Sequence, residues 1–130
     1  MGGKGSVRQG RQGEEYAACF LKEHGYRILA SNFCTKQGEI DLIAENGEYL
    51  AFIEVKTRKI GALSPGYQAV SKGKQGRIYA AAMEFIYRFP LDLQPRFDVL
   101  CLETSCESEF RVVSTEYYEN AFTTEGLKCL

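Results

Sequence analysis

Residues 8–24 carry apolar side chains at the spacing of one face of a helix. These apolar positions are Tyr16, Ala17, Phe20 and Leu21. Gly25 follows them, and glycine is the residue that most often closes a helix in the left-handed conformation. The pattern therefore predicts a first helix over residues 8–24.

A second helical stripe lies in the middle of the chain, formed by Ile78, Ala82, Phe85 and Phe89. Ser71 precedes it and suits a helix N-cap, because its hydroxyl can accept a backbone N–H. Pro90 follows, and proline cannot continue a helix. The pattern predicts a second helix from Ser71 to Phe89, after a loop that covers residues 60–70.

The other apolar segments are short and are typical of strands. They are residues 26–33, 39–45, 48–56, 96–103 and 110–114, and a final helical turn is expected over residues 117–122. The order α-β-β-β-α-β-β predicts an α/β fold with a central mixed β-sheet flanked by helices. The length of 130 residues suits one domain, residues 1–130.

The second and third strands form a hairpin around an Asn-Gly pair, the strongest short hairpin signal. A two-residue turn would place Asp41 opposite Phe52. It would also place Glu39 opposite Glu54, on the same face. Lys56 lies two residues beyond Glu54 and so shares that face.

Carboxylates that share one face of a strand pair repel one another unless a cation lies between them. Hard oxygen ligands without histidine or cysteine favour Mg²⁺ or Mn²⁺. The five cysteines form no Cys-x-x-Cys pair and there is one histidine, so the usual spacing of a zinc site is absent. Asp41 and Glu54 are the expected ligands, and Lys56 is expected to assist chemistry at phosphate. A solvent-exposed strand face with alternating charges is the alternative.

The net charge of −1 argues against an indiscriminate nucleic-acid binder, but the charges are segregated. Residues 55–83 hold six basic and no acidic side chains, whereas residues 98–119 hold six acidic and one basic. The side chains expected to contact nucleic acid are Arg58, Lys59, Lys72, Lys74, Arg77 and Gln68. The alternatives are a solvated surface or, for the acidic segment, a protein-binding surface. Asp98 is expected to pair with a buried or edge partner, with a role as a second metal ligand as the alternative.

The pattern of Asp41 followed by Glu54-x-Lys56 resembles the PD-(D/E)xK nuclease superfamily, of restriction-endonuclease-like fold. That resemblance implies a metal held by the two acids, with Lys56 as the catalytic lysine. Proline often precedes the first acid in that superfamily, and this sequence has Ile40 there.

Nearly the whole chain resembles the YraN-like family of small, uncharacterised bacterial proteins. The matching segments are residues 13–14 (GE), 38–43 (GEIDLI), 52–58 (FIEVKTR), Lys74, 96–98 (RFD) and 120–122 (NAF). The family is similar in outline to archaeal Holliday-junction resolvases, which implies that Glu14 joins the metal site. Glu39, on the same predicted face as Asp41 and Glu54, is expected as a further ligand.

The expected function is a Mg²⁺-dependent endonuclease that hydrolyses DNA phosphodiester bonds in branched or damaged DNA. The alternative is a nucleic-acid-binding module with the nuclease fold and no efficient catalysis. Symmetric cleavage of a branched substrate would require two copies, so a homodimer is expected. No apolar run approaches the length of a membrane span, and the basic N-terminus lacks the apolar stretch of a secretory signal, so a cytoplasmic location is expected.

Overall fold

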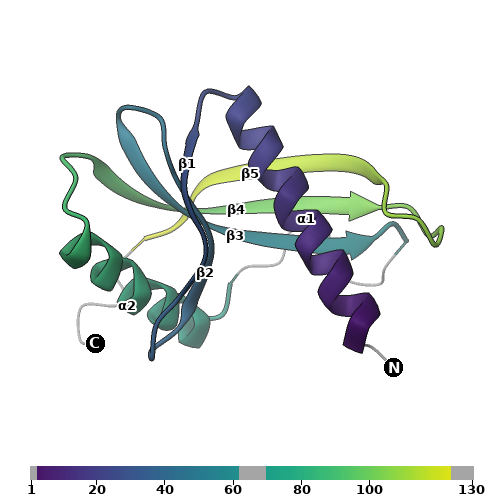
Figure 1. Cartoon of the computed structure of the whole chain (residues 1–130), viewed down its shortest axis with the longest axis horizontal. Coiled ribbons are helices and arrows are strands. Elements are labelled where there is room, and N and C mark those ends of the chain that lie inside the picture. The colour runs from purple at the N-terminus through teal and green to yellow at the C-terminus, as the bar shows by residue number, and fades with distance from the viewer. Residues whose placement is uncertain (1–2, 62–69, 124–130) are drawn as a thin grey trace.

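The two helical stripes and the strand-like segments form elements in the predicted order (Figure 1). The structure is a computed structural model that describes residues 3–61 and 70–123. Its elements are α1 (Gly3–Glu23), β1 (Arg27–Cys34), β2 (Glu39–Glu45), β3 (Tyr49–Lys59), α2 (Lys72–Arg88), β4 (Gln94–Thr104) and β5 (Val112–Phe122). Ser71 caps α2 as predicted, because its side chain accepts a hydrogen bond from the Lys74 backbone N–H at 3.3 Å.

The five strands form one mixed sheet in the order β1-β2-β3-β4-β5. Neighbouring strands are antiparallel except β3 and β4, which are parallel and are connected through α2. α1 packs on one face, where Ala17 and Leu21 meet Leu42 and Ile53. α2 packs on the other face against residues that include Ile43 and Phe52. Among the described residues, no helix has both the length and the apolar character that crossing a membrane requires.

The register of the β2–β3 hairpin differs from the predicted one by two residues. Glu45 pairs with Leu50, so four residues connect the strands instead of two. The Asn46 side chain sets this longer turn, because its Oδ1 accepts the backbone N–H groups of Glu48 at 3.0 Å and Tyr49 at 2.8 Å. A shift of two residues keeps every side chain on its predicted face of β3, since the faces of a strand alternate with period two.

The helical turn expected over residues 117–122 is wrong, because this segment belongs to β5. Tyr117 pairs with Leu100 of β4 and packs on the α1 side, whereas Tyr118 pairs with Val99 and packs on the α2 side. Successive aromatic residues that bury on opposite faces are a strand pattern. Pairing with a central strand distant in the sequence therefore decides the conformation.

Asp98 on β4 is fully buried and paired, as the sequence predicts. Its carboxylate accepts hydrogen bonds from Arg96 Nε at 2.9 Å and from the Asn120 backbone N–H at 2.8 Å. The Tyr117 hydroxyl also donates to it, and burial beside the Asp98 carboxylate raises the pKa of Tyr117, which keeps that hydroxyl a neutral donor. This network joins β4 to β5.

Replacing Gly38 with alanine is expected to destabilise the fold by about 1–3 kcal/mol. A Cβ at this position would lie 2.7 Å from the backbone oxygen of Arg77, so α2 would have to move away from the start of β2. Urea denaturation measures the loss. Gly10→Ala is the matched control, since no atom lies within 4 Å of its Cβ position and alanine favours a helix by up to about 1 kcal/mol. Equal effects of the two substitutions would contradict the close approach.

Candidate active site

The candidate site lies where β2 and β3 stop pairing. The last paired residues are Leu42 and Ile53, so continuation of the register sets Asp41 beside Glu54. The next backbone N–H of β3, that of Val55, donates to the Asp41 side chain at 2.8 Å instead of to a backbone carbonyl of β2. In Figure 1, β2 runs steeply across the direction of β3. The Asp41 side chain therefore connects β2 to β3 just beyond the last paired residues.

Three elements bring charged groups near the Asp41 carboxylate. The pKa of Asp41 is raised from 3.8 to about 7. Burial is the largest cause, followed by repulsion from Glu54 on β3 and then from Glu14 on α1. The hydrogen bond from Val55 and the charge of Lys74 on α2 act in the opposite direction. The structure thus places Glu14 and Glu54 within electrostatic reach of Asp41.

Glu14 reaches this region because α1 packs closely on β3 at Gly13. A Cβ on Gly13 would lie 2.6 Å from the Thr57 hydroxyl oxygen, so a larger residue would force the Thr57 side chain or α1 to shift. The Glu14 Oε1 atom accepts a hydrogen bond of 2.9 Å from the side-chain amide of Asn32 on β1. Asn32 was not predicted as a site residue, although asparagine is uncommon in strands and its place in the middle of one is a signal that could have identified it.

Glu54 is buried, with 8% of its surface exposed, and its carboxylate forms an ion pair with the Lys74 ammonium. Lys74 was predicted to contact nucleic acid, and here it neutralises one acid of the candidate site. Lys56 lies on the same face of β3 as Glu54, two residues further on, beside Cys101 of β4. Burial raises the pKa of the Cys101 thiol, and the charge of Lys56 lowers it, which places the ammonium near that sulfur.

Glu39 occupies a more exposed position at the start of β2. Its Oε2 accepts a hydrogen bond from Cys34 Sγ at 3.5 Å, and the groups that shift the pKa of Asp41 do not include it. Within residues 3–61 and 70–123, no three side chains of His, Cys, Asp or Glu converge tightly enough in this conformation to hold a metal ion. The ion pair of Glu54 with Lys74 is consistent with this, because the ammonium provides the positive charge there.

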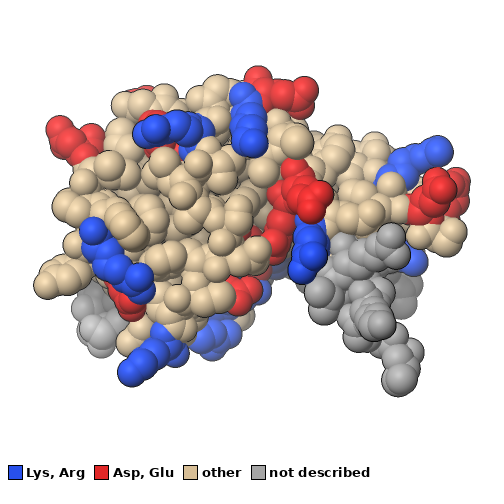
Figure 2. Space-filling view, viewed as in Figure 1, with Lys and Arg blue, Asp and Glu red and all other residues tan. Residues whose placement is uncertain are grey.

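The described side chains that were predicted to contact nucleic acid lie on α2 and at the end of β3. Lys72, Lys74 and Arg77 lie on the first turns of α2, and all three are exposed. Arg58 is ion-paired with Glu103 at 2.9 Å, so it ties β3 to β4. Lys59 is exposed, and Gln68 lies outside the described residues. On the part of the surface described in Figure 2, basic and acidic groups are interspersed.

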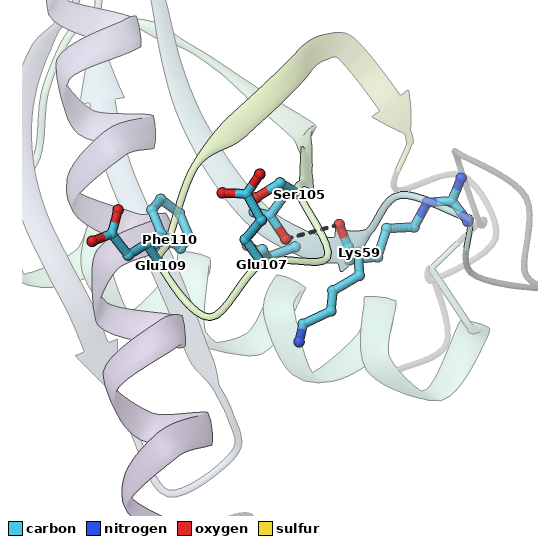
Figure 3. Close-up of a pocket in the computed structure, with 8 residues that line it drawn as sticks. Lys59, Ser105, Glu107, Glu109 and Phe110 are labelled. Carbon is cyan, nitrogen blue, oxygen red and sulfur yellow. Dashed lines mark hydrogen bonds between the residues drawn. The ribbon is translucent and has the colours of Figure 1, made fainter.

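A separate cavity of about 170 Å³ lies beyond the end of β3 (Figure 3). Its lining comes from the end of β3, including Lys59, and from the turn between β4 and β5, including Ser105, Glu107 and Glu109. The three residues of the Asp41, Glu54 and Lys56 pattern do not line it. This lining mixes basic Lys59 with acidic Glu107 and Glu109, so the candidate site remains at the opening between β2 and β3.

Comparison with known proteins identifies similar chains of similar length. A family model described as "Uncharacterised protein family UPF0102" matches residues 13–102, which include the acids and the lysine of the site. A UPF0102 protein of Anaeromyxobacter dehalogenans is 40% identical over 128 residues, covering 96% of this chain and 92% of the relative. One of Geotalea uraniireducens is 38% identical over 114 residues, covering 87% of each chain. These matches confirm the predicted resemblance to a family of uncharacterised bacterial proteins, while membership of the nuclease superfamily stays a prediction.

Proposed function

Because the chain belongs to the uncharacterised protein family UPF0102, we propose its function from the geometry of the site: a metal-dependent endonuclease that hydrolyses DNA phosphodiester bonds. One observation carries this proposal. Glu14, Asp41 and Glu54 come from three elements, and burial together with repulsion from Glu54 and Glu14 raises the pKa of Asp41 to about 7. A fold that holds repelling carboxylates together loses stability unless a cation or a proton compensates them.

The donors fit Mg²⁺ or Mn²⁺. They are carboxylate oxygens, and Mg²⁺ binds through one or two protein carboxylates when phosphate and water supply its other ligands. Asp41 and Glu54 would hold the cation with help from Glu14, and Lys74 would have to leave Glu54 for both oxygens of that carboxylate to become available. Released from Glu54, the exposed Lys74 side chain is suited to bind a phosphate of the incoming DNA.

The cation, when bound, supplies Lewis-acid polarisation of the phosphate and lowers the pKa of the attacking water. The chain's own groups then position the reactants. Lys56 carries a fixed positive charge on the face of Glu54, and an ammonium placed beside the reacting phosphate stabilises the negative charge that develops on its oxygens. Exposed Lys72 and Arg77 on α2 are available for neighbouring phosphates of the backbone.

Replacing Lys56 with alanine is expected to slow cleavage by about 10²–10³-fold, the usual effect of removing one group that stabilises transition-state charge. The assay measures cleavage of end-labelled single-stranded, duplex and branched DNA in Mg²⁺ or Mn²⁺. Glu54→Gln is expected to lose cleavage as well. Glu48→Gln in the exposed hairpin turn is the matched control and should cut at the unaltered rate. A protein that cuts none of these substrates, or variants that cut equally well, would refute the nuclease.

A nucleic-acid-binding module without efficient catalysis is the second candidate, and the ion pair between Lys74 and Glu54 favours it. An internal cation already compensates one acid, so the site can be stable with no metal. This candidate predicts DNA binding that needs no divalent ion and weakens steeply as salt rises. Binding that requires Mg²⁺ or Mn²⁺ would exclude it.

A further inference from the structure

Asn32 adopts an unusual backbone conformation in the middle of β1. Its φ is 53°, in the left-handed region, and among the described residues other than glycine only Asn120 shares a positive φ. Strand residues normally have strongly negative φ, and asparagine tolerates the left-handed region better than most side chains. The chain therefore departs from regular strand geometry at one residue while the pairing on both sides continues.

The pairing on both sides places Asn32 beside the candidate site. Ser31 pairs with Leu42, and Phe33 pairs with Ile40, so Asn32 lies next to Asp41 across the β1–β2 ladder. Its side-chain Nδ2 donates to Glu14 Oε1 at 2.9 Å. Asn32 thus links Glu14 on α1 to the region around Asp41 on β2.

A hydrogen bond from a neutral amide to a carboxylate has two consequences for Glu14. It stabilises the anion without adding a positive charge that would repel a cation, and it fixes the plane of the carboxylate. With Oε1 engaged, Oε2 is the oxygen left to coordinate a cation. Groups that orient a metal-binding side chain in this way usually change metal affinity by about 10–100-fold when they are removed.

We propose that Asn32 is a positioning residue that orients the Glu14 carboxylate toward a divalent cation shared with Asp41. This role rests on the proposed function of the same site. A merely structural role, in which the amide only joins α1 to β1, would affect the stability of the fold and leave cation affinity unchanged.

Asn32→Gly separates these two roles, because glycine accepts a positive φ and removes only the amide. Mn²⁺ is the probe, and its dissociation constant is measured from the electron paramagnetic resonance signal of the free ion. Asn32→Gly is expected to weaken Mn²⁺ binding by about 10-fold. The matched control is Asn120→Gly, which makes the same replacement at a φ of 54° on β5, and its affinity should stay within about twofold of the unaltered protein.

A double-substitution cycle identifies the route of the effect. Once Glu14→Ala has removed the carboxylate, adding Asn32→Gly should cause no further loss of Mn²⁺ affinity. In the metal-free protein, the side-chain ¹H–¹⁵N signal of Asn32 should shift when Glu14 becomes alanine, since its acceptor is lost.

The outcomes distinguish this role from the proposed function. Unchanged Mn²⁺ affinity in Asn32→Gly, an equal loss in Asn120→Gly, or an Asn32 amide signal indifferent to Glu14→Ala would each overturn the role of Asn32 alone. Failure of the unaltered protein to bind Mn²⁺ would overturn the proposed function, and the positioning role with it.

Discussion

Asp98→Ala is expected to lower the free energy of unfolding by about 3–5 kcal/mol, the usual cost of removing one partner of a buried ion pair. Arg96 is 8% exposed, and its guanidinium donates to the Asp98 carboxylate at 2.9 and 2.8 Å. Burial lowers the pKa of Arg96, but the hydrogen bonds from Arg96 to Asp98 and Tyr26 outweigh burial, so Arg96 stays charged at every accessible pH. Without Asp98, that charge would remain buried with its main acceptor gone.

Urea denaturation of the two proteins at neutral pH measures the loss. Glu84→Ala is the control, because it removes the exposed ion pair with Arg88, which is worth only about 0–0.5 kcal/mol. Replacing Arg96 and Asp98 together with methionine and leucine should recover part of the loss, since no unpaired charge would remain. A cost for Asp98→Ala no larger than that of Glu84→Ala would show that the buried network adds no stability.

The order of elements was predictable because each depends on a local pattern. The stripe of Ile78 and Phe85 has the helical period, Ser71 supplies the N-cap, and the Asn-Gly pair marks the hairpin. The exact hairpin register was not predictable, since it depends on which backbone N–H groups the Asn46 side chain accepts. The conformation of residues 117–122 was not predictable either, because their pairing partner is β4, far away in the sequence.

The candidate site was likewise predictable where it depends on local patterns and not where it depends on contacts between distant segments. Glu54 and Lys56 could be placed on one face of β3 from strand periodicity alone, and the shift of the register by two residues preserved that face. The ion pair between Lys74 and Glu54 and the hydrogen bond from Asn32 to Glu14 connect elements that are remote in sequence. They depend on how α1 and α2 pack, which Gly13 and Gly38 set through close backbone approach.

The free energy of unfolding of the unaltered, metal-free protein is expected to fall as the pH rises. Asp41→Asn is expected to abolish this fall. The folded pKa of Asp41 is about 7, raised first by burial and then by Glu54, against an ordinary value of 3.8. A raised folded pKa means that the contribution to stability is complete below the unfolded value and disappears as the pH passes through 7. Relative to Asp41→Asn, the unaltered protein should therefore lose about 2–3 kcal/mol between about pH 5 and pH 8.5.

Urea denaturation at a series of pH values, with a chelator present, gives the two stability curves. The asparagine Oδ1 can still accept the Val55 N–H, so the substitution removes the charge and keeps the contact at the opening of the strands. The two proteins share every other ionisable side chain, so the difference between the curves isolates Asp41. Millimolar Mg²⁺ should restore stability to the unaltered protein above pH 7 and leave Asp41→Asn unchanged, because a ligand stabilises only the folded state that binds it. Parallel curves without metal would mean that the acids are not held in mutual repulsion, and the observation that carries the nuclease proposal would be lost.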